Sequence, residues 1–576
     1  MIQHFNGKFE KLSDVVIETP NKDEIIKAFN DIDNRLVNAT SGEEAIKIVK
    51  ELFSLSDDVR TIFSMIFIRH TINTTDKKYD DLSNLLNEIG PEIDEASNQV
   101  DKDFINSKFR KELEAEFGEL MFKEMELSNK TFSSEIVPDL VEENKLSSEY
   151  VNLISGALIE YKGEKLSIPQ MGKYTSSLDR ATRAEASELV WKFYAENDDK
   201  IGDIYDRMVK VRTKIAQKLG YKNFLQLGYD RMGRLDWNSD DAQVYRDKIL
   251  EYIVPLSNKI FAAQKERLGY GNDTKYYDYS IFYKTGNPTP KGDTEYLISA
   301  AQDMYSQLSP IASKYFNFMV EHGCLDLDAK PGKAGGGYMD YIPGLKTAFI
   351  FSNSNRTSGD VDTLTHEFGH SLQGFLGGEI EIPAYRNPGM ECCEMHSMSM
   401  EYLTYPWMNL FFKEDTDKYH YQHLCDAITF IPYGSIVDAF QVYVYEHPEI
   451  SHKERKAYWR KLEEQFLPHR QYEGNEFLTS GGYWMRQHHI FENPLYYLDY
   501  TIAQIVALEF FDESREDSEK AFSKYIAFDK LGGTLPFRSL LKKAGIKNPM
   551  EGDTLKEVAS SVMDYLSKFN PSLLDK

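Results

Sequence analysis

Helical periodicity runs through most of this 576-residue chain and constrains its fold more than any other feature. Apolar residues recur every three to four positions over residues 22–125, 179–220 and 294–320. That spacing is typical of helices that bury one face. Ser41 followed by Glu44 adds a helix-start signal. The sequence therefore predicts a mainly α fold, in the form of a multi-lobed helical body.

Two segments interrupt the helical pattern with turn-forming residues. Gly, Tyr, Asn, Pro and Thr accumulate over residues 268–292, and residues 330–338 hold four glycines. Shortly afterwards, residues 347–352 form an apolar run that is typical of a short strand. Residues 335–341 can supply its antiparallel partner through a Pro-Gly turn. We therefore expect a small β element within the helical body.

The lobes are expected to be tightly joined. No internal repeat and no low-complexity linker divides the sequence. We place one boundary near residue 175. Residues 1–175 are predicted to form an N-terminal helical region, and residues 176–576 a second region that contains most of the histidines.

The charge balance is strongly acidic and argues against several classes of partner. Asp and Glu total 92 against 67 for Lys and Arg, which gives a formal net charge of −25. A field of that sign repels phosphate backbones and anionic membrane surfaces, so we expect no nucleic-acid partner and no membrane association. No apolar run approaches the roughly 18 residues of a membrane-spanning helix.

Cysteine usage and the first residues bear on the compartment. Four cysteines in so long a chain do not make a disulfide framework, which favours a reducing environment. The first residues lack the basic flank and apolar run of a secretory signal. We therefore expect a cytoplasmic location.

The histidines locate the chemistry in the C-terminal half. Ten of the 13 lie between residues 366 and 489, and His366, Glu367 and His370 form an HExxH motif. On a helix, positions i and i+4 share a face, so two imidazoles can hold one zinc ion with the glutamate beside them as a base. We expect this helix to run from a cap at Asp360 to Gly377, with an apolar stripe on the side opposite the histidines.

A catalytic zinc ion needs a third protein ligand and one open position. Residues 389–401 read as a second helix, on which several glutamates group on one side. We choose Glu394 as the third ligand, with Glu401 two turns further on as its support. Glu391 and His396 are the rival ligands.

These motifs together resemble a known family. The HEFGH motif followed by Glu-x-x-Ser-x-x-x-Glu, from Glu394 to Glu401, resembles the thimet oligopeptidase and oligoendopeptidase F family of zinc metallopeptidases. The Pz-peptidase-like bacterial branch is the most similar. Residues 489–503, residues 333–338 and the Asp179-Arg180 pair with Arg183 agree with the same family. The resemblance covers about residues 170–560, and the N-terminal helices more weakly.

The resemblance implies a helical body with a deep substrate channel, zinc at its base and a small β element beside the HExxH helix. It also implies cleavage of short unstructured peptides. Gly335, Gly336, Gly337 and Tyr338 would then pair with the substrate backbone, since glycines allow another backbone to approach closely. A plain hairpin is the alternative for this segment.

A histidine and tyrosine block completes the predicted site. Asn493 and Pro494 make a helix start, which places Tyr497 and Tyr500 at i and i+3 on neighbouring surface. A phenol hydroxyl or an imidazole can donate to the oxyanion that forms when water attacks a carbonyl. The resemblance selects Tyr497, Tyr500 and His489 for this role, while Tyr496 and His488 remain ambiguous.

The sequence therefore predicts a zinc-dependent endo-oligopeptidase with one Zn²⁺ per chain, with residues 176–576 as its catalytic region. His366, His370 and Glu394 hold the metal, and Glu367 is the general base that helps water cut internal peptide bonds. A zinc carboxypeptidase or dipeptidase on the same core is one alternative. A catalytically silent peptide-binding protein is another, although a pure binder does not need Glu367.

Overall fold

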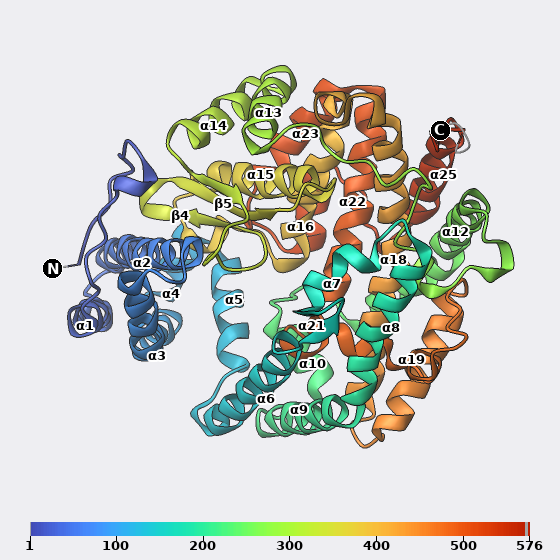
Figure 1. The fold of residues 1–576 in the computed structure, drawn as a ribbon. Helices are drawn as coiled ribbons and strands as arrows, with labels where there is room; N and C mark the ends of the chain where they lie inside the picture. The colour runs from blue at the N-terminus through green and yellow to red at the C-terminus, as the bar shows by residue number, and fades with distance from the viewer. Residues whose placement is uncertain (1, 571–573, 576) are drawn as a thin grey trace. The chain divides into compact units, whose positions relative to one another are not determined.

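The computed structural model describes residues 2–570 and 574–575. They form two compact units, each assembled from segments that lie far apart in sequence. Unit 1 comprises residues 1–129, 289–414 and 513–546, and unit 2 comprises residues 130–288, 415–512 and 547–576. Helices dominate both units, so the predicted mainly α fold is confirmed (Figure 1). The boundary near residue 175 stays a prediction.

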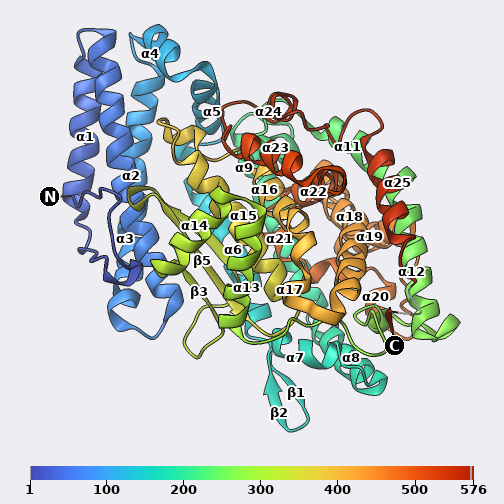
Figure 2. The same cartoon turned by 90° about the horizontal axis from the view of Figure 1, so that it is seen from above.

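Three long helices open unit 1: α1 (Lys22–Asn38), α2 (Gly42–Ile72) and α3 (Lys77–Ile105). They run side by side (Figure 2), and their apolar faces merge into one buried cluster, as the helical spacing predicts. The other helices of unit 1 are α4 (Arg110–Phe117), α5 (Glu119–Lys130), α13 (Thr294–Leu308), α14 (Pro310–Glu321), α15 (Gly359–Gly377), α16 (Met390–Leu403), α17 (Asn409–Phe412), α23 (Ser518–Asp529) and α24 (Phe537–Ala544).

The β element of unit 1 is a three-stranded sheet in the order β3-β5-β4. As predicted, β4 (Tyr338–Ile342) and β5 (Thr347–Ser354) are antiparallel, and a short turn at Pro343–Leu345 joins them. The parallel strand β3 (Leu325–Asp328) was not predicted, because four residues carry too little periodicity. Helix α15 packs against β4 and β5, which places the sheet beside the HExxH helix (Figure 1).

Unit 2 is built from helices and one small hairpin of β1 (Ile159–Tyr161) and β2 (Glu164–Leu166). Residues 179–220, predicted as one long helical region, form two helices that meet at Asn197. Helix α22 carries the chain from unit 2 into unit 1. The helices of unit 2 are α6 (Val137–Ser155), α7 (Ile168–Thr175), α8 (Arg180–Glu196), α9 (Asp198–Lys218), α10 (Phe224–Arg231), α11 (Ser239–Lys248), α12 (Val254–Leu268), α18 (Thr416–Glu446), α19 (His452–Phe466), α20 (Glu476–Thr479), α21 (His488–Glu492), α22 (Tyr497–Glu516) and α25 (Thr554–Leu566).

One helical stretch of the described chain, Asn409–Glu446, is long and apolar enough by length and composition to cross a membrane. No such stretch was predicted from the sequence, because the expected signal was an uninterrupted apolar run. In the structure, 67% of its most apolar window is buried inside the protein. Burial to this extent is typical of a helix in the core of a protein.

Candidate metal centre

Helix α15 presents the HExxH motif on the side away from its buried stripe. Val361, Phe368 and Leu372 are fully buried, whereas His366 and His370 are only partly buried. The two imidazole rings lie 5.0 Å apart between centroids, as expected for positions one turn apart. The helix ends at Gly377 as predicted. Asp360 is not its cap: the carboxylate lies inside the first turn and accepts the amide protons of Asn355 and Arg356.

Helix α16 brings the third candidate ligand to the histidines. The Oε2 atom of Glu394 lies 3.1 Å from Nε2 of His366 and 3.4 Å from Nε2 of His370. One donor atom from each of the three residues falls within 4.8 Å of the others. Two imidazole nitrogens and one carboxylate oxygen are a donor set of catalytic zinc sites, so the residues fit such an ion.

Hydrogen bonds hold these side chains in place. The Nδ1 atom of His366 lies 2.8 Å from Oε1 of Glu401, and Ser397 donates to Glu394 over 3.0 Å. A carboxylate on the second imidazole nitrogen fixes the ring and leaves Nε2 for a ligand. Glu401 therefore takes the supporting position predicted for it.

The charges of the cluster depend on one another. Burial alone would lower the pKa of His366, but its bonds to Glu394 and Glu401 raise the pKa well above its ordinary value. Burial would raise the pKa of Glu394, but the two histidines hold it well below its usual range. The Glu394 carboxylate and the two imidazole nitrogens therefore lie together at a position where a positive charge is stabilised. A proton meets this need, and so does a divalent cation.

Gly369, inside the HEFGH motif, lets the two helices approach. A Cβ atom at this position would lie 2.7 Å from the carbonyl oxygen of His396 and 2.8 Å from the Cα of Ser397. Both atoms belong to the backbone of α16, so no side chain can move aside. Tyr525 of α23 donates to the same His396 carbonyl over 3.0 Å. This contact was not predicted, because a single glycine in a helix does not reveal which helix approaches it.

Gly369→Ala is therefore expected to push α16 away and to displace Glu394. Overpacking of this kind lowers the free energy of unfolding by about 1–3 kcal/mol, and we expect metal affinity to fall about 10–100-fold. Gly90→Ala is the matched control, because Gly90 lies in α3 and a methyl group added there would meet nothing within 4 Å. Thermal unfolding and zinc titration measure both effects. Unchanged zinc affinity in Gly369→Ala would contradict this role.

The rival ligands lie elsewhere. His396 is buried with its Nδ1 atom 2.5 Å from Asp529, and its ring stacks on Phe528. Glu391 is buried near Glu124, and burial together with the charge of Glu391 raises the pKa of Glu124 to about 7. Neither rival belongs to the cluster of three candidate donors.

The histidine and tyrosine block lies in unit 2, where its members contact one another. The ring of His489 lies 4.8 Å from that of Tyr497 and 5.8 Å from that of Tyr500. Helix α22 begins at Tyr497 rather than at Pro494, because Leu495 adopts a left-handed backbone with φ of 67°. Tyr497 and Tyr500 still share its first turn.

Two unpredicted residues support His489. Gln487 contacts Nδ1 of His489 through Nε2 over 2.8 Å, and Tyr433 donates to Oε1 of Gln487 over 2.7 Å. The neighbouring His488 contacts Glu492 and stacks edgewise on Tyr150 instead. Gln487 adjoins the predicted block, but a glutamine has no spacing signal that would single it out.

The glycine segment precedes the edge strand β4. Gly335, Gly336 and Gly337 are exposed, and a Cβ atom on Gly335 or Gly336 would meet nothing within 4 Å. The side chain of Asn353 fixes the segment by donating to the carbonyl of Gly336. Strand pairing begins only at Tyr338, whose hydroxyl bonds to Thr71. Gly335 and Gly336 therefore leave free space beside their backbone, whereas a Cβ atom on Gly337 would lie 3.4 Å from the carbonyl oxygen of Phe351.

A helix that carries HExxH, joined by a glutamate from a second helix, is the arrangement of a metallopeptidase site. Comparison with known proteins agrees. Residues 173–560 match Peptidase family M3, and residues 12–132 match the Peptidase M3 N-terminal domain. The chain belongs to peptidase family M3.

Individual relatives carry related names. The solved structure of Pz peptidase A with an inhibitor is 42% identical, covers 98% of this chain and 100% of that chain, and has a TM-score of 0.90. Oligopeptidase PepF of Bacillus subtilis is 22% identical over 65% of this chain, and an oligoendopeptidase F homolog of Borreliella burgdorferi is 22% identical over 64%. The matched stretches span 55% and 64% of these two relatives. Together they support an oligoendopeptidase F-like peptidase.

Proposed function

We propose that this chain is a zinc-dependent endo-oligopeptidase that cuts internal bonds of short unstructured peptides. The observation that carries the proposal is the His366, His370 and Glu394 cluster, with Glu367 beside it on α15. A zinc ion held there would lower the pKa of water and polarise the scissile carbonyl. Cleavage of a peptide blocked at both ends, lost with a chelator, tests the proposal.

Glu367 is proposed as the general base. The residue is only 8% exposed, and burial raises the pKa of its carboxyl group above the ordinary value. A carboxylate with a raised pKa accepts a proton more readily than an exposed one. In the proposed reaction it takes a proton from the attacking water and passes that proton to the leaving amine.

The unit 2 block is proposed to stabilise the oxyanion. Burial raises the pKa of Tyr497, which keeps its hydroxyl protonated as a donor at neutral pH. Because Oε1 of Gln487 accepts from Tyr433, its Nε2 donates to Nδ1 of His489. A neutral His489 then carries its proton on Nε2 and can donate it to an oxyanion, together with Tyr497 and Tyr500.

Gln487→Met is expected to lower kcat about 10-fold while zinc content stays unchanged. The loss is smaller than the roughly 10²–10³-fold cost of removing an oxyanion donor outright, because His489 stays but its proton is no longer fixed on Nε2. The matched control is Gln471→Met, since the exposed Gln471 makes only a long bond to a backbone carbonyl. Steady-state kinetics and metal analysis provide the readouts. If Gln487→Met retained the wild-type kcat, Gln487 would have no role in orienting His489.

Substrate backbone is proposed to pair with the segment from Gly335 to Tyr338. Its exposed glycines leave room for a second backbone, and β4 is an edge strand of the sheet. The names of the relatives, oligopeptidase and oligoendopeptidase, favour short peptides and internal bonds. A carboxypeptidase or dipeptidase on the same core would instead require a free peptide end.

A cytoplasmic location is also proposed. All four cysteines are free, which agrees with a reducing compartment.

A further inference from the structure

Unit 2 contains a cavity of about 690 Å³ that the proposed chemistry does not use. Helices α7 and α8, the loop that follows α12 and the segments around residues 470 and 485 line it. Its walls carry many aromatic rings, among them Trp191, Tyr277 and Tyr483. Two arginines and two histidines also line it, but none of its described lining residues is Asp or Glu. The chain as a whole has a net charge of −25, whereas this cavity is lined by basic residues and by no acidic ones among those described.

Arg486 is the most accessible cation of the cavity. The residue is exposed as a whole, and its guanidinium lies 3.3 Å from the Tyr483 hydroxyl and 5.9 Å from the Trp191 ring. No carboxylate of the described chain pairs with it within 4.0 Å. A guanidinium with aromatic contacts but no anion is suited to an incoming carboxylate.

Arg470 is incompletely neutralised. Its Nη1 atom is buried without a hydrogen-bond partner and lies 3.6 Å from Glu463. That carboxylate also accepts from Tyr472 over 2.6 Å and from Arg460 over 3.2 Å. Burial alone would raise the pKa of Tyr483, but the charges of Arg470 and Arg486 outweigh burial and lower it. The cavity therefore holds an excess of positive charge.

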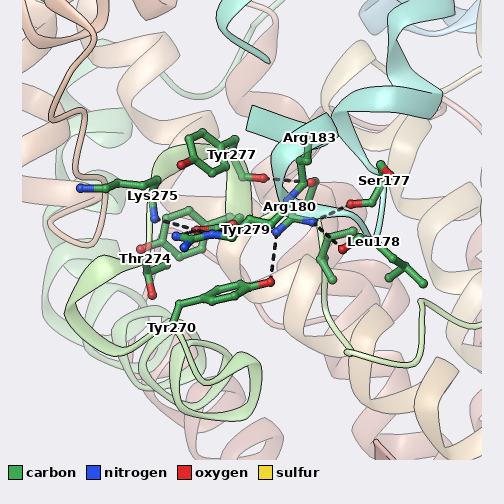
Figure 3. Close-up of polar contacts among 12 residues, drawn as sticks. Ser177, Leu178, Arg180, Arg183, Tyr270, Thr274, Lys275, Tyr277 and Tyr279 are labelled. Carbon is green, nitrogen blue, oxygen red and sulfur yellow. Dashed lines mark hydrogen bonds and ion pairs between the residues drawn. The ribbon is translucent and has the colours of Figure 1, made fainter. Parts of the chain in front are cut away.

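A buried ion cluster fixes one wall of the cavity. Figure 3 shows Arg180 and Arg183 of α8 reaching the loop that carries Tyr277 and Tyr279. Both arginines bond to Asp278, over 2.8 Å from Arg180 and 2.7 Å from Arg183, and Asp278 is fully buried. Charge-assisted bonds of this kind hold the loop in place before a ligand arrives, which reduces the entropy lost on binding.

We propose that this cavity binds the C-terminal residue of a peptide, with its carboxylate on Arg486 and its side chain against the aromatic walls. A free phosphate would use the arginines but leave the rings without a partner. A peptide ending in a bulky side chain uses both, as in pockets that combine apolar walls with a few placed polar groups. The inference rests on the proposed function, because it takes a peptide as the ligand.

Calorimetric titration tests the proposal on the full chain carrying Glu367→Gln, so that peptide is not consumed. The probes are acetyl-Ala-Ala-Ala-Phe as free acid and as C-terminal amide. A charge-assisted bond contributes enough for the acid to bind about 10–100-fold more tightly than the amide. Adding Arg486→Met should lower the affinity for the acid to that for the amide, and it should leave the affinity for the amide unchanged. Arg486→Lys should retain part of the preference for the acid over the amide. Lysine keeps the positive charge but cannot form the two parallel hydrogen bonds that a guanidinium makes to a carboxylate.

Arg207→Met is the matched control, because Arg207 is a partly exposed arginine of unit 2 paired with Glu149 and Asp203 outside the cavity. It should leave both affinities unchanged. Equal binding of acid and amide would overturn the proposal, as would an equal loss of both in Arg486→Met. Displacement of the acid by inorganic phosphate at the peptide's own concentration would assign the site to small anions instead. Because binding is measured without turnover, failure of the wild-type chain to cut peptides would refute only the proposed function.

Discussion

Glu394→Ala is expected to lower zinc affinity on the order of 10²–10³-fold and to abolish peptidase activity at ordinary zinc concentrations. The variant keeps His366 and His370 but removes the carboxylate that lies 3.1 and 3.4 Å from them. Structural zinc sites with four ligands bind with about 10–16 kcal/mol, so one ligand accounts for roughly a quarter of that free energy. Zinc content after dialysis, measured by atomic emission, and peptide hydrolysis give the two readouts.

The matched control for that variant is Glu391→Ala, a buried glutamate one turn earlier on the same helix. It removes a carboxylate that is not one of the three clustered donors and whose charge raises the pKa of Glu124, so zinc and activity should both persist. The ligand assignment would be wrong if Glu391→Ala lost zinc while Glu394→Ala retained it. Circular dichroism distinguishes a loss of the ligand from a loss of the fold. If Glu394→Ala is folded, its spectrum should match that of the metal-free wild type.

Glu367→Gln should separate catalysis from metal binding. The amide keeps the size and hydrogen bonding of the side chain but cannot accept the proton from water. We expect kcat to fall on the order of 10²–10⁴-fold, while zinc content and peptide affinity remain. Asp360→Asn is the control on the same helix, since the Asp360 carboxylate accepts hydrogen bonds from Asn355 and Arg356 and is not one of the clustered donors.

The kinetic signature decides between two roles for Glu367. If it acts only as a base, kcat falls and KM changes little, because ground-state binding is preserved. If it instead helps to hold the metal, zinc is lost along with activity. Wild-type kcat in zinc-loaded Glu367→Gln would remove Glu367 from the proposed mechanism.

Much of the site followed from sequence because it depends on helical spacing. The i and i+4 positions of His366 and His370 set their shared face, and the apolar stripe set which face of α15 is buried. The same argument grouped Glu394 with Glu401 on α16, and both lie beside His366 in the structure. Local periodicity thus predicted which side chains share a face within each helix, although the same spacing also grouped Glu391, which is not one of the clustered donors.

Other features depend on tertiary contacts that local spacing does not encode. Gly369 matters because the backbone of α16 crosses it, and the sequence alone does not say which helix will do so. Gln487 acts through Tyr433, which lies 54 residues earlier. Helix α22 starts late because Leu495 adopts a positive φ, a conformation that propensity does not favour for leucine. The basic cavity likewise combines segments from residues 154 to 488.

Product mapping by mass spectrometry tests the central claim most directly. A mixed pool of oligopeptides, blocked by N-acetyl and C-terminal amide groups, is incubated at high concentration with the zinc-loaded chain, with the chelated chain and with the chain reloaded with zinc. We expect internal cuts that disappear on chelation and return with zinc. Intact blocked peptides, alongside release of terminal residues from unblocked ones, would contradict an endo-oligopeptidase and favour a carboxypeptidase or dipeptidase on the same core.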